Sequence, residues 1–187
     1  MPPKAKFSKE EITEAAVNIV KSEGLQALTA RALGAKLGTS SSPIFRVFQN
    51  MDEVQQEVLK SANQLYQNYL EADMKSKKYP PYKSSGMAYI RFAKEEKELF
   101  KLLFMRDRSQ EKLSENKEEI RPLIELIKQN LNINENEAYL FHMEMWIYVH
   151  GIATMAATSY LNWDIEFINK TLTDVYTGLK HCYTGEN

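Results

Sequence analysis

The chain has 187 residues, with 43% hydrophobic and 26% charged side chains and only 7 glycines and 6 prolines. This composition is typical of one or two compact domains, and it excludes collagen-like, low-complexity and disordered proteins. The single cysteine, Cys182, excludes an intramolecular disulfide and a cysteine-based zinc finger and is typical of a reducing compartment. We therefore expect a cytoplasmic protein without a metal or other cofactor.

Neither a membrane span nor an export signal is expected. Polar residues interrupt every apolar stretch well before the roughly 20 residues that a bilayer-spanning helix needs. The basic residues of segment 1–6 are followed by polar residues rather than by the apolar region of an export signal.

Charge is distributed unevenly along the chain. Residues 1–50 hold seven Lys or Arg against four Glu, a net charge of +3, so the rest of the chain holds −4 of the total of −1. A small basic segment on a larger acidic one is the pattern of a DNA-binding module joined to a partner-binding domain. Excesses this small also arise by chance, so the pattern needs support from a motif.

Capping residues predict two helices in the first 40 residues. Ser8 and Glu11 have the spacing of a capping box, and the helix that they open should end at Gly24. Thr29 is a good N-cap for a second, short helix, which Gly38 should end.

The next segment predicts a third short helix. Residues 39–42 carry four hydroxyl groups that can cap a helix, and Pro43 suits the first turn. The apolar side chains of Ile44 and Phe48 follow, as a buried helix face requires.

A long helix is expected over about 52–74, with Asp52 as its candidate N-cap. Residues 75–86 are rich in Lys, Pro, Ser and Gly, which predicts a linker or surface loop. Helical periodicity resumes over 87–104, and the charged stretch 94–98 predicts a bend or two consecutive helices.

The C-terminal part of the chain predicts three more helices. The first covers about 117–131, and its Pro122 must lie in the first turn or produce a kink. The second begins after Asn134 and continues toward Leu161; it is apolar almost all round, which is typical of a buried helix. The last helix follows residues 162–164 and carries a heptad-like apolar seam. The seam consists of Ile165, Ile168, Leu172, Val175 and Leu179.

Together these patterns predict an all-α protein of about nine helices, because no strand-like alternation of useful length appears. Residues 1–50 should form a three-helix head with a helix-turn-helix, and residues 51–187 a helical regulatory and dimerisation domain. The apolar helix and the seam after it predict an intersubunit four-helix bundle, so we expect a homodimer through the last two helices. An ordinary core stripe is the alternative interpretation of the seam.

The head has the features of a helix-turn-helix unit, which are two short helices joined by a glycine-containing turn. The second helix enters the major groove of DNA, so its first turn needs small or hydrogen-bonding groups and its inner face needs apolar anchors. Residues 40–42, all serines, meet the first need; Ile44, Phe45 and Phe48 meet the second. Double-stranded DNA is therefore the expected partner, and a plain helical hairpin is the alternative.

Residues 28–48 resemble the DNA-binding head of the TetR family. The matching residues are Thr29, Arg31, Leu33, Gly38, Ser40, Phe45 and Phe48. The resemblance implies a ligand-responsive transcriptional regulator, most often a repressor, that binds a pseudopalindromic operator as a homodimer and is released by a small molecule. The residues expected at the DNA are Thr29, Arg31, Ser40, Ser41, Ser42, Pro43, Phe45 and Arg46, with Ser40 acting mainly as a helix cap.

Four positions depart from the family pattern. Met51 stands where many relatives have a Lys, and Phe45 where a Tyr is customary, so two groups that can reach phosphate are missing. Thr39 replaces a customary apolar residue. Gly34 replaces a customary Ala, which should weaken its helix by about 1 kcal/mol.

The C-terminal half also resembles one branch of TetR-like effector domains, which carries a Trp-His-Gly signature. Trp146 and His150 are four residues apart on one helix face, and Gly151 follows. Methionine and aromatic side chains suit a pocket for a small apolar or aromatic effector, although each of them alone is more often a core residue. The expected pocket residues are Phe100, Phe104, Met143, Trp146 and His150.

A metal site and a catalytic site are not expected. His142 and His150 lie eight residues apart on one helix, about 12 Å along its axis, so they cannot share one ion. No metalloprotease, phosphate-loop or nucleophile-elbow motif occurs in the sequence. Two other functions stay open: a helical dimer that binds a protein partner through its C-terminal domain, and an enzyme that uses the same cavity.

Overall fold

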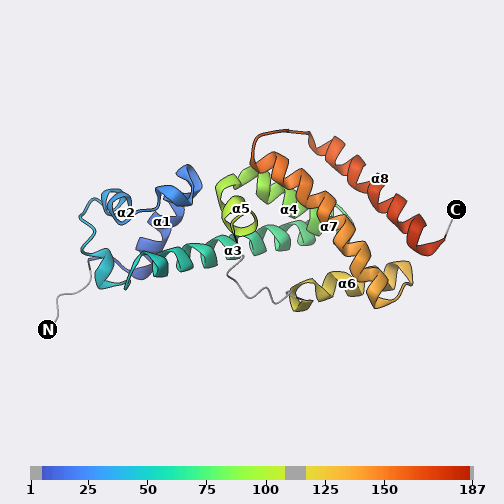
Figure 1. Cartoon of the computed structure of the whole chain (residues 1–187), viewed down its shortest axis with the longest axis horizontal. Coiled ribbons are helices and arrows are strands. Elements are labelled where there is room, and N and C mark those ends of the chain that lie inside the picture. The colour runs from blue at the N-terminus through green and yellow to red at the C-terminus, as the bar shows by residue number, and fades with distance from the viewer. Residues whose placement is uncertain (1–5, 108–116, 186–187) are drawn as a thin grey trace. The chain divides into compact units, whose positions relative to one another are not determined.

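The computed structural model describes residues 6–107 and 117–185. Within these ranges the chain consists of eight α-helices and two 3₁₀ turns, with no β-strand, which confirms the predicted all-α fold (Figure 1). The elements are α1 (Lys9–Glu23), η1 (Leu25–Ala27), α2 (Ala30–Lys36), η2 (Ile44–Arg46), α3 (Met51–Ser76), α4 (Pro81–Glu95), α5 (Lys97–Phe104), α6 (Lys117–Leu131), α7 (Glu135–Ala157) and α8 (Ile165–Thr184). None of the described helices combines the length and the hydropathy of a membrane span.

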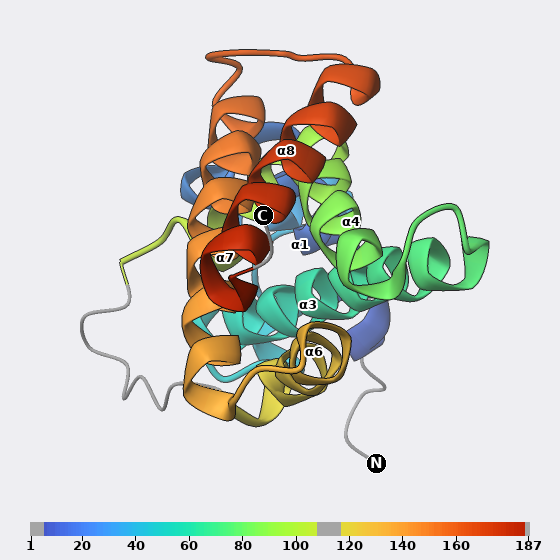
Figure 2. The same cartoon turned by 90° about the vertical axis from the view of Figure 1, so that its right-hand side faces the viewer.

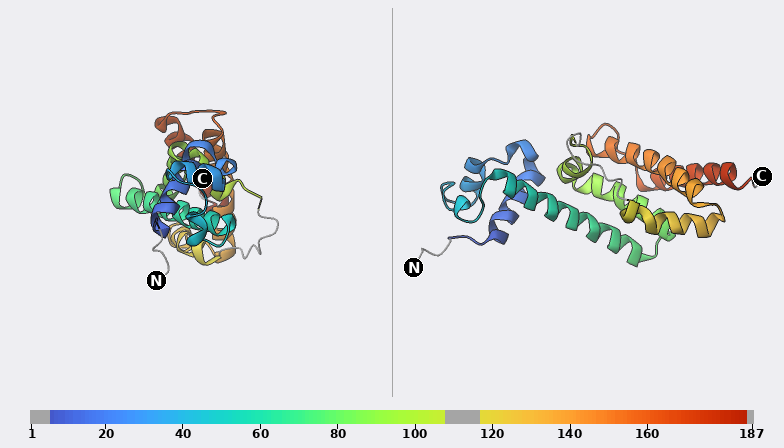
Figure 3. Two further views of the ribbon diagram at one scale, coloured as in Figure 1. Left: turned by 90° about the vertical axis from the view of Figure 1, so that its left-hand side faces the viewer. Right: turned by 60° about the horizontal axis from the view of Figure 1, so that its bottom comes forward.

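The chain forms two compact units. The N-terminal unit contains Met1–Asn68 and Glu96–Arg106, and the C-terminal unit contains Tyr69–Glu95 and Asp107–Asn187. Helix α3 belongs to both and is uninterrupted along its length (Figure 3). The units differ from the predicted functional domains, because α5 and the first half of α3 pack with the N-terminal helices; the functional division remains a prediction.

The two predicted helix caps of the N-terminal unit are confirmed. The Ser8 hydroxyl accepts a hydrogen bond from the Glu11 amide at 3.1 Å, and the Glu11 carboxylate accepts one from the Ser8 amide at 2.7 Å. The Thr29 hydroxyl accepts from the Ala32 amide at 3.1 Å and so opens α2. These helices close over a fully buried core of Ile12, Ala16, Val20, Leu33, Ile44, Phe48, Val54, Val58, Leu99 and Phe100.

The start of α3 corrects the predicted cap. Asn50, not Asp52, supplies it, because the Asn50 side-chain oxygen accepts a hydrogen bond from the Glu53 amide at 2.9 Å. The Glu53 carboxylate accepts in turn from the amide of Gln49, the residue before the cap, at 2.7 Å.

The predicted loop 75–86 is also shorter in the structure. Helix α4 begins at Pro81, because proline at the first helical position loses no hydrogen bond that the helix would use. The hydroxyls of Ser84 and Ser85 bond back to the carbonyl oxygens of Tyr79 and Tyr82, which makes these polar residues compatible with the first turns. The predicted break near 94–98 is confirmed between α4 and α5.

The C-terminal unit is built around the packing of α4 against α7, with α6 and α8 also lying against α7 (Figure 2). Two lysines of α4 tie the α8 segment to it. The Lys83 ammonium donates to the Asn169 carbonyl oxygen at 3.1 Å and to the Thr173 hydroxyl at 2.5 Å, and the Lys94 ammonium donates to the Trp163 carbonyl oxygen at 2.8 Å.

Helix α7 corrects the prediction of a helix buried all round. Phe141 and Ala153 are fully buried, but Leu140 is 54% exposed and Ile147 is 63% exposed. The reason is that α4, α6 and α8 pack on other faces of α7 and leave Leu140 and Ile147 uncovered.

The capping box at the start of α7 gives a stability prediction. The Asn134 side-chain oxygen accepts from the Glu137 amide at 3.0 Å, and the Glu137 carboxylate accepts from the Asn134 amide at the same distance. Asn134→Ala removes the side-chain oxygen that accepts from the Glu137 amide and should lower the free energy of unfolding by about 1 kcal/mol. Urea denaturation measures this change; Asn136→Ala, an exposed change in the same turn, should stay within about 0.5 kcal/mol of the parent. Equal effects of the two changes would contradict the cap.

Candidate nucleic-acid interface and regulatory site

The segment 39–48, here called the recognition segment, follows α2. Two of its side chains are buried in the core of the N-terminal unit and anchor it there. Ile44 is 0% exposed and Phe48 is 1% exposed. The turn before the segment is made by Gly38, whose φ of +65° is the left-handed conformation that favours glycine. The side chains of Ser42, Phe45 and Arg46 in the same segment are exposed to solvent.

The recognition segment contains a single 3₁₀ turn, Ile44–Arg46, instead of the predicted short α-helix. The turn is closed by hydrogen bonds from the Arg46 amide to the Pro43 carbonyl oxygen at 3.4 Å and from the Val47 amide to the Ile44 carbonyl oxygen at 3.0 Å. No side chain caps it, so the expected role of Ser40 as a helix cap is wrong. Three residues are too few for an α-helix, because its first hydrogen bond already spans four residues.

Most of the predicted DNA-contacting side chains lie at the surface. Six of the eight are exposed, and Ser41 and Pro43 are half-buried. The exposed residues are Thr29, Arg31, Ser40, Ser42, Phe45 and Arg46. All eight belong to the start of α2 or to the recognition segment, so the N-terminal unit brings them together in one short stretch of chain.

The predicted effector residues fall into two groups. Phe100 and Phe104 lie on α5 in the N-terminal unit, where their ring centroids are 5.1 Å apart and Phe104 meets the edge of Tyr66 at 5.3 Å. Met143 and the two remaining residues lie on α7 in the C-terminal unit.

In the C-terminal unit, Trp146 and His150 stack face to face, as their spacing of four residues predicts. Their ring centroids are 4.8 Å apart and the planes differ by 13°. The Tyr89 hydroxyl of α4 lies 2.9 Å from Nδ1 of His150, which makes a hydrogen bond between the helices. Burial lowers the pKa of His150 below its usual value, so the neutral ring is favoured.

A second tyrosine and histidine meet two helical turns away. The Tyr82 hydroxyl lies 3.1 Å from Nδ1 of His142. Burial raises the pKa of Tyr82 and lowers the pKa of His142, so both groups stay neutral near pH 7. The sequence contained a signal for these pairs, since the tyrosines are seven residues apart on α4 and the histidines eight apart on α7. Assigning each tyrosine to its histidine required knowing that α4 and α7 run in the same direction.

These pairs predict that the protein loses stability in mild acid. A histidine whose pKa is lowered by folding takes up its proton first in the unfolded chain, so its contribution is present above the unfolded pKa near 6.5 and is lost as the pH falls below it. The stability that His142 contributes should therefore fall between pH 7.5 and 5.5. Urea denaturation at the two pH values measures it. His142→Gln should flatten the pH dependence. An unchanged slope in His142→Gln would contradict this account.

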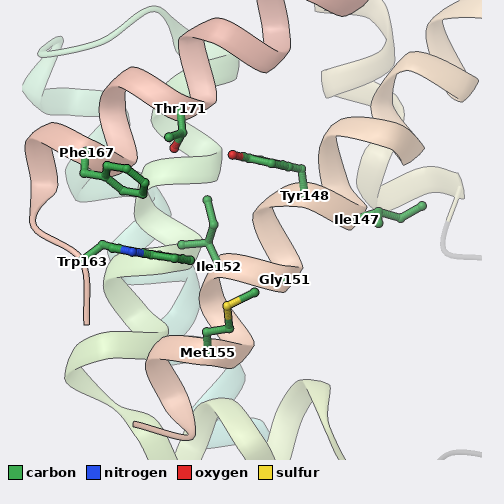
Figure 4. Close-up of a pocket in the computed structure, with 8 residues that line it drawn as sticks. All are labelled: Ile147, Tyr148, Gly151, Ile152, Met155, Trp163, Phe167 and Thr171. Atoms are coloured by element: carbon green, nitrogen blue, oxygen red, sulfur yellow. The ribbon is translucent and has the colours of Figure 1, made fainter. Parts of the chain in front are cut away.

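The C-terminal unit also contains an open pocket of about 330 Å³ between α7, α8 and the segment that joins them (Figure 4). Its wall is almost entirely apolar, and the hydroxyl ends of Tyr148 and Thr171 point to one side of it. The lining residues are Ile147, Tyr148, Gly151, Ile152, Met155, Trp163, Phe167 and Thr171. None of the five predicted effector residues is among them. The signal that sequence reasoning missed is the spacing of Trp163 and Phe167, whose ring centroids are 5.3 Å apart.

No three His, Cys, Asp or Glu side chains within 6–107 and 117–185 gather as ligands for a metal ion.

Comparison with known proteins places this arrangement in a family. Residues 83–175 match the family model described as the tetracyclin repressor-like C-terminal domain. The fold is similar to that of a TetR family member from Streptomyces coelicolor A3, with a TM-score of 0.57 and 15% sequence identity, over 92% of this chain and 98% of that one. A search of curated protein sequences gave no match. The chain belongs to the TetR family of DNA-binding transcriptional regulators.

Proposed function

We propose that this protein is a ligand-responsive repressor that binds a pseudopalindromic operator as a homodimer and leaves it when a small apolar or aromatic effector binds. The observation that carries the proposal is the recognition segment, whose buried Ile44 and Phe48 hold Ser42, Phe45 and Arg46 at the surface. A location with access to DNA, the cytoplasm, follows from the proposed activity. We propose no enzymatic role.

The proposed DNA contacts divide by chemistry. Arg31 and Arg46 are exposed cations that suit phosphate oxygens or guanine edges. The Ser42 hydroxyl can donate and accept a hydrogen bond at a base edge. The Phe45 ring, 44% exposed, has no hydroxyl for a phosphate and offers only apolar contact. Thr29, Ser40, Ser41 and Pro43 complete the proposed interface.

The proposed dimer uses the uncovered face of α7 together with α8. Large apolar side chains are exposed on α7 and in the first turn of α8, among them Leu140, Ile147, Ile165 and Phe167. Exposed large apolar side chains that lie near one another on a folded chain are typical of an interaction site. A two-fold axis through it would present two recognition segments to successive major grooves of one operator.

The proposed effector contacts the Trp146 and His150 stack, with Met143 on the same helix. The indole and imidazole faces suit a flat apolar or aromatic molecule, and the Tyr89 and His150 pair supplies a hydrogen-bonding group beside them. Phe100 and Phe104, which pack within the N-terminal unit, remain predicted effector residues. Release from DNA requires that the effector bind the state that does not bind DNA more tightly, typically by about 1 to 3 kcal/mol.

Selection of binding sites from a random duplex-DNA library tests the proposed function. The purified full-length protein is used at near-physiological salt, which suppresses non-specific attraction to phosphates. Recovery of an inverted repeat would support a dimeric, sequence-specific regulator and provide a probe for effector screening. Recovery of no motif would contradict the proposal and favour a helical dimer that binds a protein partner through its C-terminal domain.

A further inference from the structure

Gly34 lies buried in the middle of α2, directly beneath the start of the recognition segment. A Cβ atom built on Gly34 would lie 3.0 Å from the Ser40 carbonyl carbon, 3.0 Å from the Thr39 carbonyl oxygen and 3.1 Å from the Ser40 carbonyl oxygen. Carbon atoms in contact normally stay about 3.5 to 4.0 Å apart. A methyl group at this position would therefore make unusually tight contacts, and the start of the recognition segment would have to move by a few tenths of an ångström.

The three atoms that a methyl group would meet belong to the backbone, so no side chain can rotate away. The same backbone is held by a hydrogen bond from the Thr39 amide to the Gly34 carbonyl oxygen at 2.9 Å. The preceding turn is held by a bond from the Gly38 amide to the Ala35 carbonyl oxygen at 3.0 Å. A methyl group at residue 34 would therefore press on the backbone of Thr39 and Ser40.

We propose that Gly34 is a positioning residue for DNA recognition. Its missing side chain sets how closely the recognition segment lies on α2, and this fixes the register of Ser42, Phe45 and Arg46 in the groove. The proposal rests on the proposed DNA-binding function. It also accounts for a glycine in a helix interior, where alanine has the higher helix propensity and would be the better residue if helix formation alone decided.

The test compares Gly34→Ala with Ala35→Gly in the full-length protein. The two variants exchange the same methyl group at neighbouring positions of α2, but residue 35 is exposed. Hydrogen exchange measures the protection of the Thr39 amide and of the other amides of the recognition segment. DNA binding is measured on the selected operator and, at low salt, on unrelated duplex DNA.

Gly34→Ala should speed exchange of the Thr39 amide by about tenfold, because the bond to Gly34 is strained. It should weaken operator binding by about tenfold, equivalent to the loss of one base contact. Binding to unrelated DNA and the dimer should stay as in the parent. Ala35→Gly should leave the operator preference intact, even though it lowers the helix propensity of α2.

Three outcomes would overturn the proposal. Unchanged exchange of the recognition segment in Gly34→Ala would show that the segment tolerates the methyl group. Equal losses on operator and unrelated DNA, or an equal loss in Ala35→Gly, would show a merely structural role for α2. If the parent protein itself binds no specific site, the proposed function fails and the recognition role fails with it, while the exchange data still decide whether Gly34 places the segment.

Discussion

Ser42→Glu should abolish specific DNA binding while the protein remains folded and dimeric. Ser42 is exposed on the recognition segment, next to the turn that carries Phe45 and Arg46. In the proposed complex a glutamate there would bring a negative charge among the phosphates of the groove and would also fill space that the small hydroxyl leaves free. Like charges at an interface cost several kcal/mol, so operator affinity should fall by more than about 100-fold.

The measurement is a titration of the selected operator, with circular dichroism and sedimentation to check folding and dimerisation. Asn18→Asp is the matched control, since it adds one negative charge of almost unchanged size at an exposed position of α1. The control should weaken binding only slightly and mainly at low salt. Operator binding that survives Ser42→Glu would mean that the recognition segment does not face the groove.

The helices with local signals could be predicted from the sequence. Ser8, Thr29 and Asn134 open helices because a side-chain oxygen three residues before an amide can bond to it, and this depends on sequence spacing alone. The cap of α3 was assigned wrongly because Asn50 and Asp52 are both capable caps only two residues apart. Only the hydrogen bonds of the folded chain distinguish between them.

Errors arose where contacts between elements decide the structure. The 3₁₀ turn at Ile44–Arg46 depends on how closely its segment lies on α2, and spacing along the sequence does not contain that distance. The exposed face of α7 was missed because apolar periodicity shows which faces avoid water, but not whether this chain or another molecule covers them.

The candidate regulatory site shows the same division. The stack of Trp146 on His150 follows from a spacing of four residues within one helix. The Tyr89 partner lies 61 residues away on α4 and became visible only when the two helices were aligned. The pocket near Trp163 was missed for the same reason, since three segments form it.

Ile147→Asp should convert the proposed dimer into a folded monomer. Ile147 is 63% exposed near the middle of α7, and Leu140 is exposed two turns away on the same face. In the proposed two-fold interface each substitution acts twice, and it buries a carboxylate without a partner in an apolar contact. Such a charge costs several kcal/mol, so the dissociation constant of the dimer should rise by more than about 100-fold.

Sedimentation at several protein concentrations measures the dimer, and circular dichroism measures folding. Met74→Asp is the control, because Met74 is an exposed apolar residue of α3 outside the proposed interface, 39% exposed, and its substitution should leave the dimer intact. A dimer that persists in Ile147→Asp would place the interface elsewhere. Operator affinity should fall together with dimerisation, because a monomer has one recognition segment and can bind only one half-site. In the proposed dimer the second recognition segment binds the second half-site in the same binding event.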